Sequence, residues 1–78
     1  MTNSEVVNEY AKRLKRLVAE SGMIMDEVAK KAGTTAGTIS RHISGKHVPR
    51  LSMLERIADA LGVSPWYLAF GIGGKERQ

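Results

Sequence analysis

The stretch Met25-Asp-Glu-Val-Ala-Lys-Lys-Ala-Gly-Thr-Thr-Ala-Gly-Thr-Ile-Ser-Arg-His-Ile-Ser44 decides the fold of this chain. The spacing of its apolar residues predicts two short amphipathic helices, over 25–32 and 35–44. Gly33 is suited to close the first helix in a left-handed conformation, and Thr35 is suited to cap the second. The apolar side chains expected to point inward and fix the crossing of these helices are Val28, Ala29, Ile39 and Ile43.

Three more amphipathic segments lie on either side of this pair. A helix over 3–21 precedes it, and helices from 50 or 52 to 61 and over 65–70 follow it. No segment alternates apolar and polar residues as a half-buried strand would. We therefore expect an all-α fold, with five helices around one small core in a single domain over 1–70, and a flexible tail over 71–78.

The composition excludes several classes of function. The chain has 78 residues, a net charge of +4, no cysteine and two histidines, so we expect no disulfide, no metal site and no cofactor. No apolar run reaches the roughly 18 residues that span a bilayer. The first residues lack the basic start and apolar core of a secretory signal, so a cytoplasmic protein without a membrane partner is expected. The positive charge favours a polyanionic partner, of which nucleic acid is the commonest.

Residues spread over most of the chain resemble the helix-turn-helix family of phage lambda-type repressors and Cro proteins, also called the XRE family. The likeness covers about 14–70, with the helix-turn-helix motif itself over 25–44. The resemblance implies a five-helix lambda-repressor-like fold. It also implies a transcriptional regulator that is associated with the nucleoid. The role that the resemblance favours is that of a repressor, which binds a two-fold operator in double-stranded DNA as a homodimer. The residues whose joint spacing carries the likeness are Val28, Ala29, Gly33, Thr35, Ile39, Gly45, Pro49, the run Ile57-Ala-Asp-Ala-Leu-Gly-Val-Ser-Pro65, and Leu68.

The resemblance also implies which residues face the DNA. Thr35, Ala36, Gly37 and Arg41 are placed against base edges in the major groove. We expect Arg41 to donate two hydrogen bonds to O6 and N7 of a guanine. The alternative is that Arg41 contacts a phosphate and carries no sequence information. The residues expected to touch the DNA backbone or the flanks of the groove are Met25, Thr38, Ser44, Lys46, His47 and Arg50.

The chain departs from the family at several of these positions. Ala36 and Gly37 stand where the family often carries polar residues, so neither side chain can donate a hydrogen bond to a base. Two interpretations of Gly37 stay open: either the helix backbone lies close to the DNA, or the glycine is a chance substitution. Ile24 and Met25 replace a capping threonine and a phosphate-binding glutamine, which leaves backbone N–H groups at this helix end to bind a phosphate.

The helical pattern makes further predictions about burial. His42 is expected at the surface or half-buried, with no role as a ligand or catalyst. Leu51 is expected to belong to the apolar stripe of its helix. The methionines Met23, Met25 and Met53 are interpreted as core-filling residues. A basic cluster in the first helix is interpreted as a solvated surface in preference to a DNA contact, and its members are Lys12, Arg13, Lys15 and Arg16.

An apolar cluster near the end of the domain is expected to form the dimer interface, with at least one of its residues exposed in the monomer. The alternative function is a protein-interaction module, such as an antitoxin that also regulates its own promoter, with a toxin or an antirepressor as the protein partner. An enzyme is not expected, because the chain has no phosphate-binding glycine loop with its lysine and no acidic pair in an apolar setting. The residues of the cluster are Trp66, Tyr67, Phe70 and Ile72.

Overall fold

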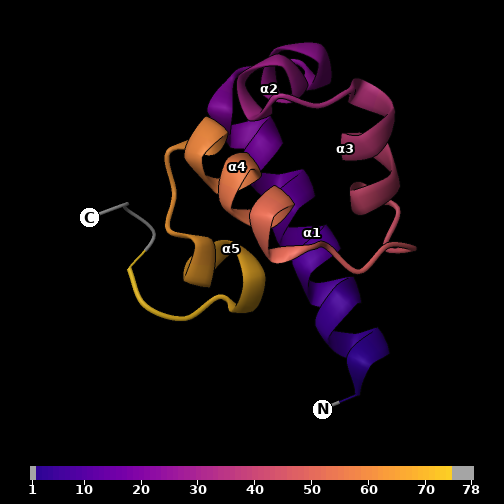
Figure 1. Ribbon diagram of the computed structural model, residues 1–78. Helices are drawn as coiled ribbons and strands as arrows, with labels where there is room; N and C mark the ends of the chain where they lie inside the picture. The colour runs from indigo at the N-terminus through magenta and orange to yellow at the C-terminus, as the bar shows by residue number, and fades with distance from the viewer. Residues whose placement is uncertain (1, 75–78) are drawn as a thin grey trace.

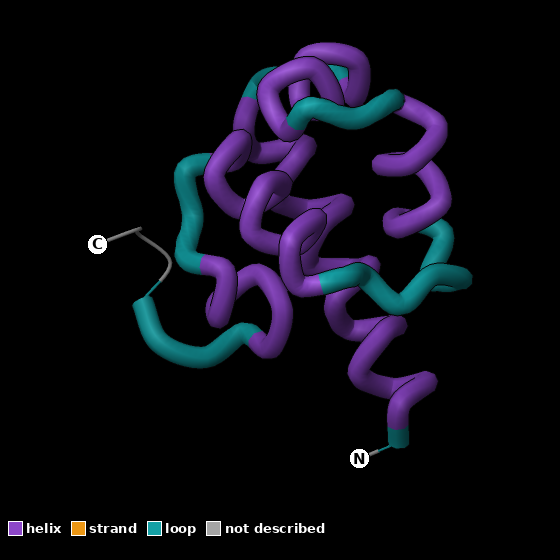
Figure 2. Tube along the Cα trace, viewed as in Figure 1, coloured by secondary structure: helices purple, strands orange, loops and turns teal. Residues whose placement is uncertain are grey.

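The computed structural model describes residues 2–74. Within that range the chain forms helices and no strand, as Figure 2 shows, so the predicted all-α fold is confirmed. None of these helices has both the length and the apolar character needed to cross a membrane. Residues 71–74 are not helical, and the rest of the predicted flexible tail lies outside the described residues. The helices are α1 (Asn3–Ser21), α2 (Met25–Ala32), α3 (Ala36–Ile43), α4 (Leu51–Leu61) and α5 (Pro65–Phe70) (Figure 1).

Local capping interactions set most of the helix boundaries. The Thr2 hydroxyl accepts a hydrogen bond from the Glu5 backbone N–H at 3.2 Å, and this cap starts α1. The Thr35 hydroxyl caps α3 in the same way. Gly33 ends α2 with φ 71°, a left-handed conformation that glycine adopts without strain. The start of α4 lies at Leu51 and uses no side-chain cap.

A single core lies where the helices meet. The long α1 packs against α3, α4 and α5, and α2 packs against α3 and α4. Helix α3 lies at one edge of the domain beside α2, and α5 lies at the opposite edge (Figure 1). The placement of α3 at an edge leaves one of its faces free. The largest fully buried side chains are Tyr10, Leu14, Val28, Ile39, Ile57 and Leu68.

Several burial predictions were wrong, and the errors cluster at helix ends. Leu51 is 82% exposed, because it lies in the first turn of α4 at the mouth of a surface groove. Met25 is also exposed at the start of α2, although Met23 and Met53 do pack against the core. Ile43, the last residue of α3, is half-buried. A helix end extends past its neighbours, so periodicity alone overestimates burial there.

Candidate DNA-binding surface

Helix α3 presents a continuous polar face to solvent. Gly37, Ser40, Arg41 and Ser44 are exposed, at spacings of three and four residues that place them on one side of the helix. No part of the described chain covers this face. Ser40 is not among the predicted DNA-facing residues, although its spacing of three residues from Gly37 indicates this face. Of the residues expected to face bases, Thr35 is exposed as well, whereas Ala36 is half-buried.

A network of polar side chains joins the start of α3 to Arg41. The Thr35 and Thr38 hydroxyl oxygens are 3.2 Å apart, and the Thr38 oxygen accepts a hydrogen bond from Arg41 Nη2 at 3.3 Å. A helical side chain leans toward the N-terminal end of its helix, so the guanidinium lies beside the first turn of α3. The network therefore brings Thr35, Thr38 and Arg41 together beside the first turn of α3.

Ser44 and the basic loop follow directly at the end of α3. The Ser44 hydroxyl donates to the Arg41 carbonyl oxygen at 2.6 Å, so its proton is already used within the helix end. Lys46, His47 and Arg50 are all exposed. Lys46 and Arg50 thus place two positive charges on the C-terminal flank of α3, where the resemblance implies contacts with the DNA backbone.

His42 anchors α3 to α1 and does not lie at the surface. It is 6% exposed, and its Nδ1 lies 2.8 Å from the Tyr10 hydroxyl oxygen. The prediction of a surface or half-buried residue was wrong, because position 42 lies three residues after the buried Ile39 and shares its inward face. Burial is tolerated because the ring nitrogen has a hydrogen-bond partner. The His47 ring stacks on His42 with centroids 6.3 Å apart, which ties the basic loop to α3.

The protonation states of this buried pair follow from its surroundings. Burial, together with the nearby His47 and Arg41, lowers the pKa of His42 below its usual 6.5. Burial also raises the pKa of Tyr10 far above its usual 10.0. The imidazole and the phenol are therefore both neutral around pH 7, which suits a neutral hydrogen bond between α1 and α3.

The N-terminal end of α2 is less suited to a phosphate than the sequence predicted. The Ile24 backbone N–H donates to Glu27 Oε1 at 3.2 Å. Asp26 adds a second carboxylate to the same first turn. Two negative charges stand where a phosphate would approach, and they oppose the attraction of the helix dipole. Met25 is exposed beside them but offers no polar group.

The charge on α3 and its flanks is of one sign. Residues 28–54 contain no aspartate or glutamate. A surface of this kind attracts the phosphates of a polyanion over a range set by the Debye length. This gap in the acidic residues is a signal in the sequence itself that points to the same surface. The lysines and arginines of this stretch, all exposed, are Lys30, Lys31, Arg41, Lys46 and Arg50.

Comparison with known proteins agrees with this geometry. A family model described as a helix-turn-helix domain matches residues 9–66. The chain belongs to this helix-turn-helix family. The match confirms the predicted helix-turn-helix DNA-binding fold, although its range lies slightly closer to the N-terminus than the expected 14–70.

The helix-turn-helix chain is also similar to a curated protein. It is 38% identical over 66 residues to the HTH-type transcriptional regulator PrtR of Pseudomonas aeruginosa, and the alignment covers 85% of this chain and 25% of that regulator. The chain thus spans about a quarter of the length of this relative. No solved structure matches it.

An arginine from α4 holds the turn of the helix-turn-helix. Arg56 Nε donates to the Ala32 carbonyl oxygen at 2.7 Å, and its Nη2 donates to the Gly33 carbonyl oxygen. A Cβ at position 33 would lie 2.7 Å from Arg56 Nη2. Glycine suits this position because of its positive φ, and a Cβ there would require the Arg56 guanidinium to shift. Helical periodicity does not predict this contact, because the contact joins elements that are far apart in the chain.

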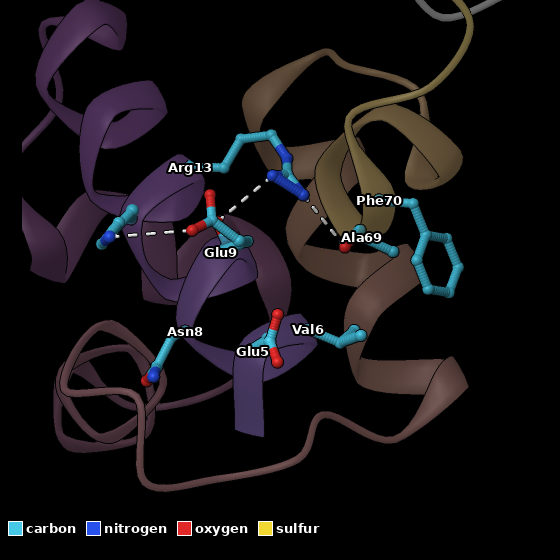
Figure 3. Close-up of a pocket in the computed structure, with 8 residues that line it drawn as sticks. Glu5, Val6, Asn8, Glu9, Arg13, Ala69 and Phe70 are labelled. Atoms are coloured by element: carbon cyan, nitrogen blue, oxygen red, sulfur yellow. Dashed lines mark hydrogen bonds and ion pairs between the residues drawn. The ribbon is translucent and has the colours of Figure 1, made fainter. Parts of the chain in front are cut away.

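Helix α5 is attached to α1 by two arginines that were expected to be solvated. Arg13 donates to the carbonyl oxygens of Tyr67, Leu68 and Ala69 at 2.9–3.1 Å, and Figure 3 shows its side chain reaching from α1 to Ala69. Arg16 Nη2 donates to the Tyr67 hydroxyl at 2.8 Å. Arg13 thereby satisfies carbonyls at the end of α5, so the prediction of a purely solvated cluster was wrong for this residue.

An apolar groove of about 480 Å³ lies between α1, α4 and α5 of the helix-turn-helix domain. Val48, Leu51, Trp66 and Phe70 line it, and each is more than half exposed. Ile72, just after α5, is exposed as well, whereas Tyr67 is half-buried against the core. Of the predicted dimer residues, Trp66, Phe70 and Ile72 therefore face solvent, whereas Tyr67 packs mainly against the core of its own domain.

Proposed function

We propose that this chain is the DNA-binding domain of a transcriptional regulator, and that it acts as a repressor by occupying a two-fold operator in double-stranded DNA. The domain extends over residues 1–70. The observation that carries the proposal is the open polar face of α3, led by Arg41 and set in a stretch without acidic residues. Repression by occupancy requires only binding to DNA, with no catalytic group and no cofactor. The expected location is the cytoplasm, in association with the nucleoid.

The proposed mode of binding inserts α3 into the major groove, which is wide enough for one helix. Arg41 reads a guanine, while the loop side chains of Lys46, His47 and Arg50 contact the DNA backbone. The exposed Ser40 joins Gly37 and Arg41 on the face that enters the groove. Arginine is suited to this role because its planar guanidinium donates two parallel hydrogen bonds.

Dimerisation on the operator is part of the proposal. Half-sites one DNA turn apart have centres about 34 Å from each other, and the longest extent of the domain is 32 Å. Two copies whose long axes run along one face of the duplex would therefore lie almost end to end. The exposed Trp66, Phe70 and Ile72 supply an apolar surface for that contact, and Leu51 and Val48 extend it.

Selection of bound duplexes from a random pool tests the DNA-binding proposal. We expect a two-fold symmetric consensus, with an affinity that falls steeply as salt is raised. Arg41→Ala should weaken binding to that consensus by about 1–3 kcal/mol and relax one base position in each half-site. Lys12→Ala, which removes an exposed cation from α1, is the matched control and should leave the base preference unchanged. Recovery of random duplexes would refute the proposed function, and an unchanged base preference in Arg41→Ala would refute the base contact assigned to Arg41.

Sedimentation of the free protein tests the dimer. Trp66→Ser and Phe70→Ser should reduce self-association. Ile24→Ser should not, since Ile24 is as exposed as Trp66 but lies at the N-terminal end of α2. Affinity for a full operator should fall toward that for a half-site in the first two variants. A chain that stays monomeric on the operator would favour the alternative function, in which the apolar groove binds a protein partner such as a toxin or an antirepressor.

A further inference from the structure

Gly37 is a glycine inside a helix whose backbone does not require glycine. Its φ is not positive, unlike the glycines that end α2, α4 and α5. Glycine is among the poorest residues for a helix interior. The local conformation therefore gives no reason for a glycine at this position.

The Arg41 guanidinium lies next to the position that a side chain at residue 37 would occupy. A Cβ built at position 37 would be 3.7 Å from Arg41 Nη1 and 3.8 Å from the Thr35 hydroxyl oxygen. Both distances are ordinary van der Waals contacts, so a methyl group fits. Any longer side chain would extend from that point into the region of the guanidinium.

The guanidinium is also held from its other side. Arg41 Nη2 donates to the Thr38 hydroxyl oxygen, which itself lies within hydrogen-bond distance of the Thr35 cap. Thr35 is fixed in turn by its bond to the Thr38 backbone N–H at 3.2 Å. Arg41 is thus held beside the first turn of α3, with the remaining N–H groups of its five available to an acceptor outside the protein.

We propose that Gly37 is a specificity-determining position of the DNA-binding surface, where the missing side chain leaves the room in which Arg41 is oriented toward its base. This inference rests on the proposed function. It treats Gly37 as a positioning residue, which acts through Arg41 and makes no hydrogen bond to DNA of its own. A different explanation, that the α3 backbone must lie against the DNA at Gly37, makes different predictions for the variants below.

A double-mutant cycle separates the two explanations. The variants are Gly37→Ala, Gly37→Leu, Arg41→Ala and the combination of the last two. Each is measured by the dissociation constant for the selected duplex and for duplexes changed at the base position that Arg41→Ala relaxes. Both Gly37 substitutions replace glycine by a better helix former. A circular dichroism melt should therefore show a fold at least as stable as the parent, and any loss of binding can be assigned to the surface.

We expect Gly37→Ala to bind within about threefold of the parent and to keep its base preference, because the methyl group fits. Gly37→Leu should lose about 10- to 100-fold in preference at the Arg41 position, the value of one bidentate contact. In the Arg41→Ala background, the same Leu substitution should change affinity by less than about threefold. That non-additivity is the signature of an effect transmitted through Arg41.

Three results would overturn the inference. Gly37→Leu could keep the parental preference, Gly37→Ala could lose affinity as Gly37→Leu does, or the Leu substitution could weaken binding equally with and without Arg41. The last two would indicate backbone approach to the DNA. These failures differ from failure of the proposed function, which would appear earlier, as the absence of a selected duplex.

Discussion

Removing the hydroxyl of Tyr10 should measure how firmly α3 is held against α1. The hydroxyl oxygen lies 2.8 Å from His42 Nδ1, and both residues are buried, at 1% and 6% exposure. Tyr10→Phe keeps the ring and removes this one bond. The net loss of a hydrogen bond is about 1 kcal/mol, and a buried partner left without a bond raises the cost toward about 1–3 kcal/mol.

We therefore expect Tyr10→Phe to lower the free energy of unfolding by about 1–2 kcal/mol, through the bond to His42. For a domain of this size, that loss corresponds to a fall in the melting temperature of roughly 5–15 °C. Tyr67→Phe is the matched control. Its hydroxyl accepts from Arg16 in an exposed setting, so its removal should cost less than about 0.5 kcal/mol.

Urea unfolding followed by far-UV circular dichroism gives both free energies. The slope of the free energy against urea should be the same in both variants and the parent, since neither substitution changes the surface exposed on unfolding. Equal urea midpoints for Tyr10→Phe and Tyr67→Phe would refute the argument that the buried hydrogen bond stabilises the packing of α3 against α1. A loss of slope in Tyr10→Phe would mean that the native state itself had changed.

Three further predictions concern pH and two contacts. The lowered pKa of His42 means that the unfolded chain binds a proton there more readily than the native state, so stability should fall as pH drops through 6.5. The raised pKa of Tyr10 means that stability should also fall as pH rises above 10.0, because the unfolded chain loses the phenol proton more readily than the native state. Urea midpoints measured across pH should show this decline in the parent, and Tyr10→Phe should lose the part that comes from Tyr10. Arg13→Met should destabilise the fold by about 1.5–3 kcal/mol through the freed α5 carbonyls, whereas Lys12→Met, on the neighbouring exposed position, should cost less than about 0.5 kcal/mol in the same thermal melts. Thr35→Ala should cost about 1 kcal/mol as the cap of α3 is lost, and Thr35→Ser should restore most of it; equal melting temperatures for the two would contradict the capping role.

The helices and their order could be predicted from the sequence because their signals are local. Apolar spacing identified each helix, and Thr2, Gly33 and Thr35 act within a few residues of their own positions. The exposure of Arg41 followed for the same reason, since it lies opposite the buried Ile39 on one short helix. The resemblance to the helix-turn-helix family rests on spacing as well, and the family match confirms it.

Tertiary structure decided the features whose partners are distant in the chain. His42 is buried because Tyr10, 32 positions away, offers it a hydrogen bond. Arg13 donates to carbonyl oxygens of α5 more than 50 positions away, a contact that the apolar spacing of neither helix predicts. Leu51 follows an apolar pattern yet faces solvent, since only packing determines where the core ends. Sequence periodicity predicts which face of a helix is apolar. The packing of that helix against the others determines how much of the apolar face is buried and which polar groups form hydrogen bonds.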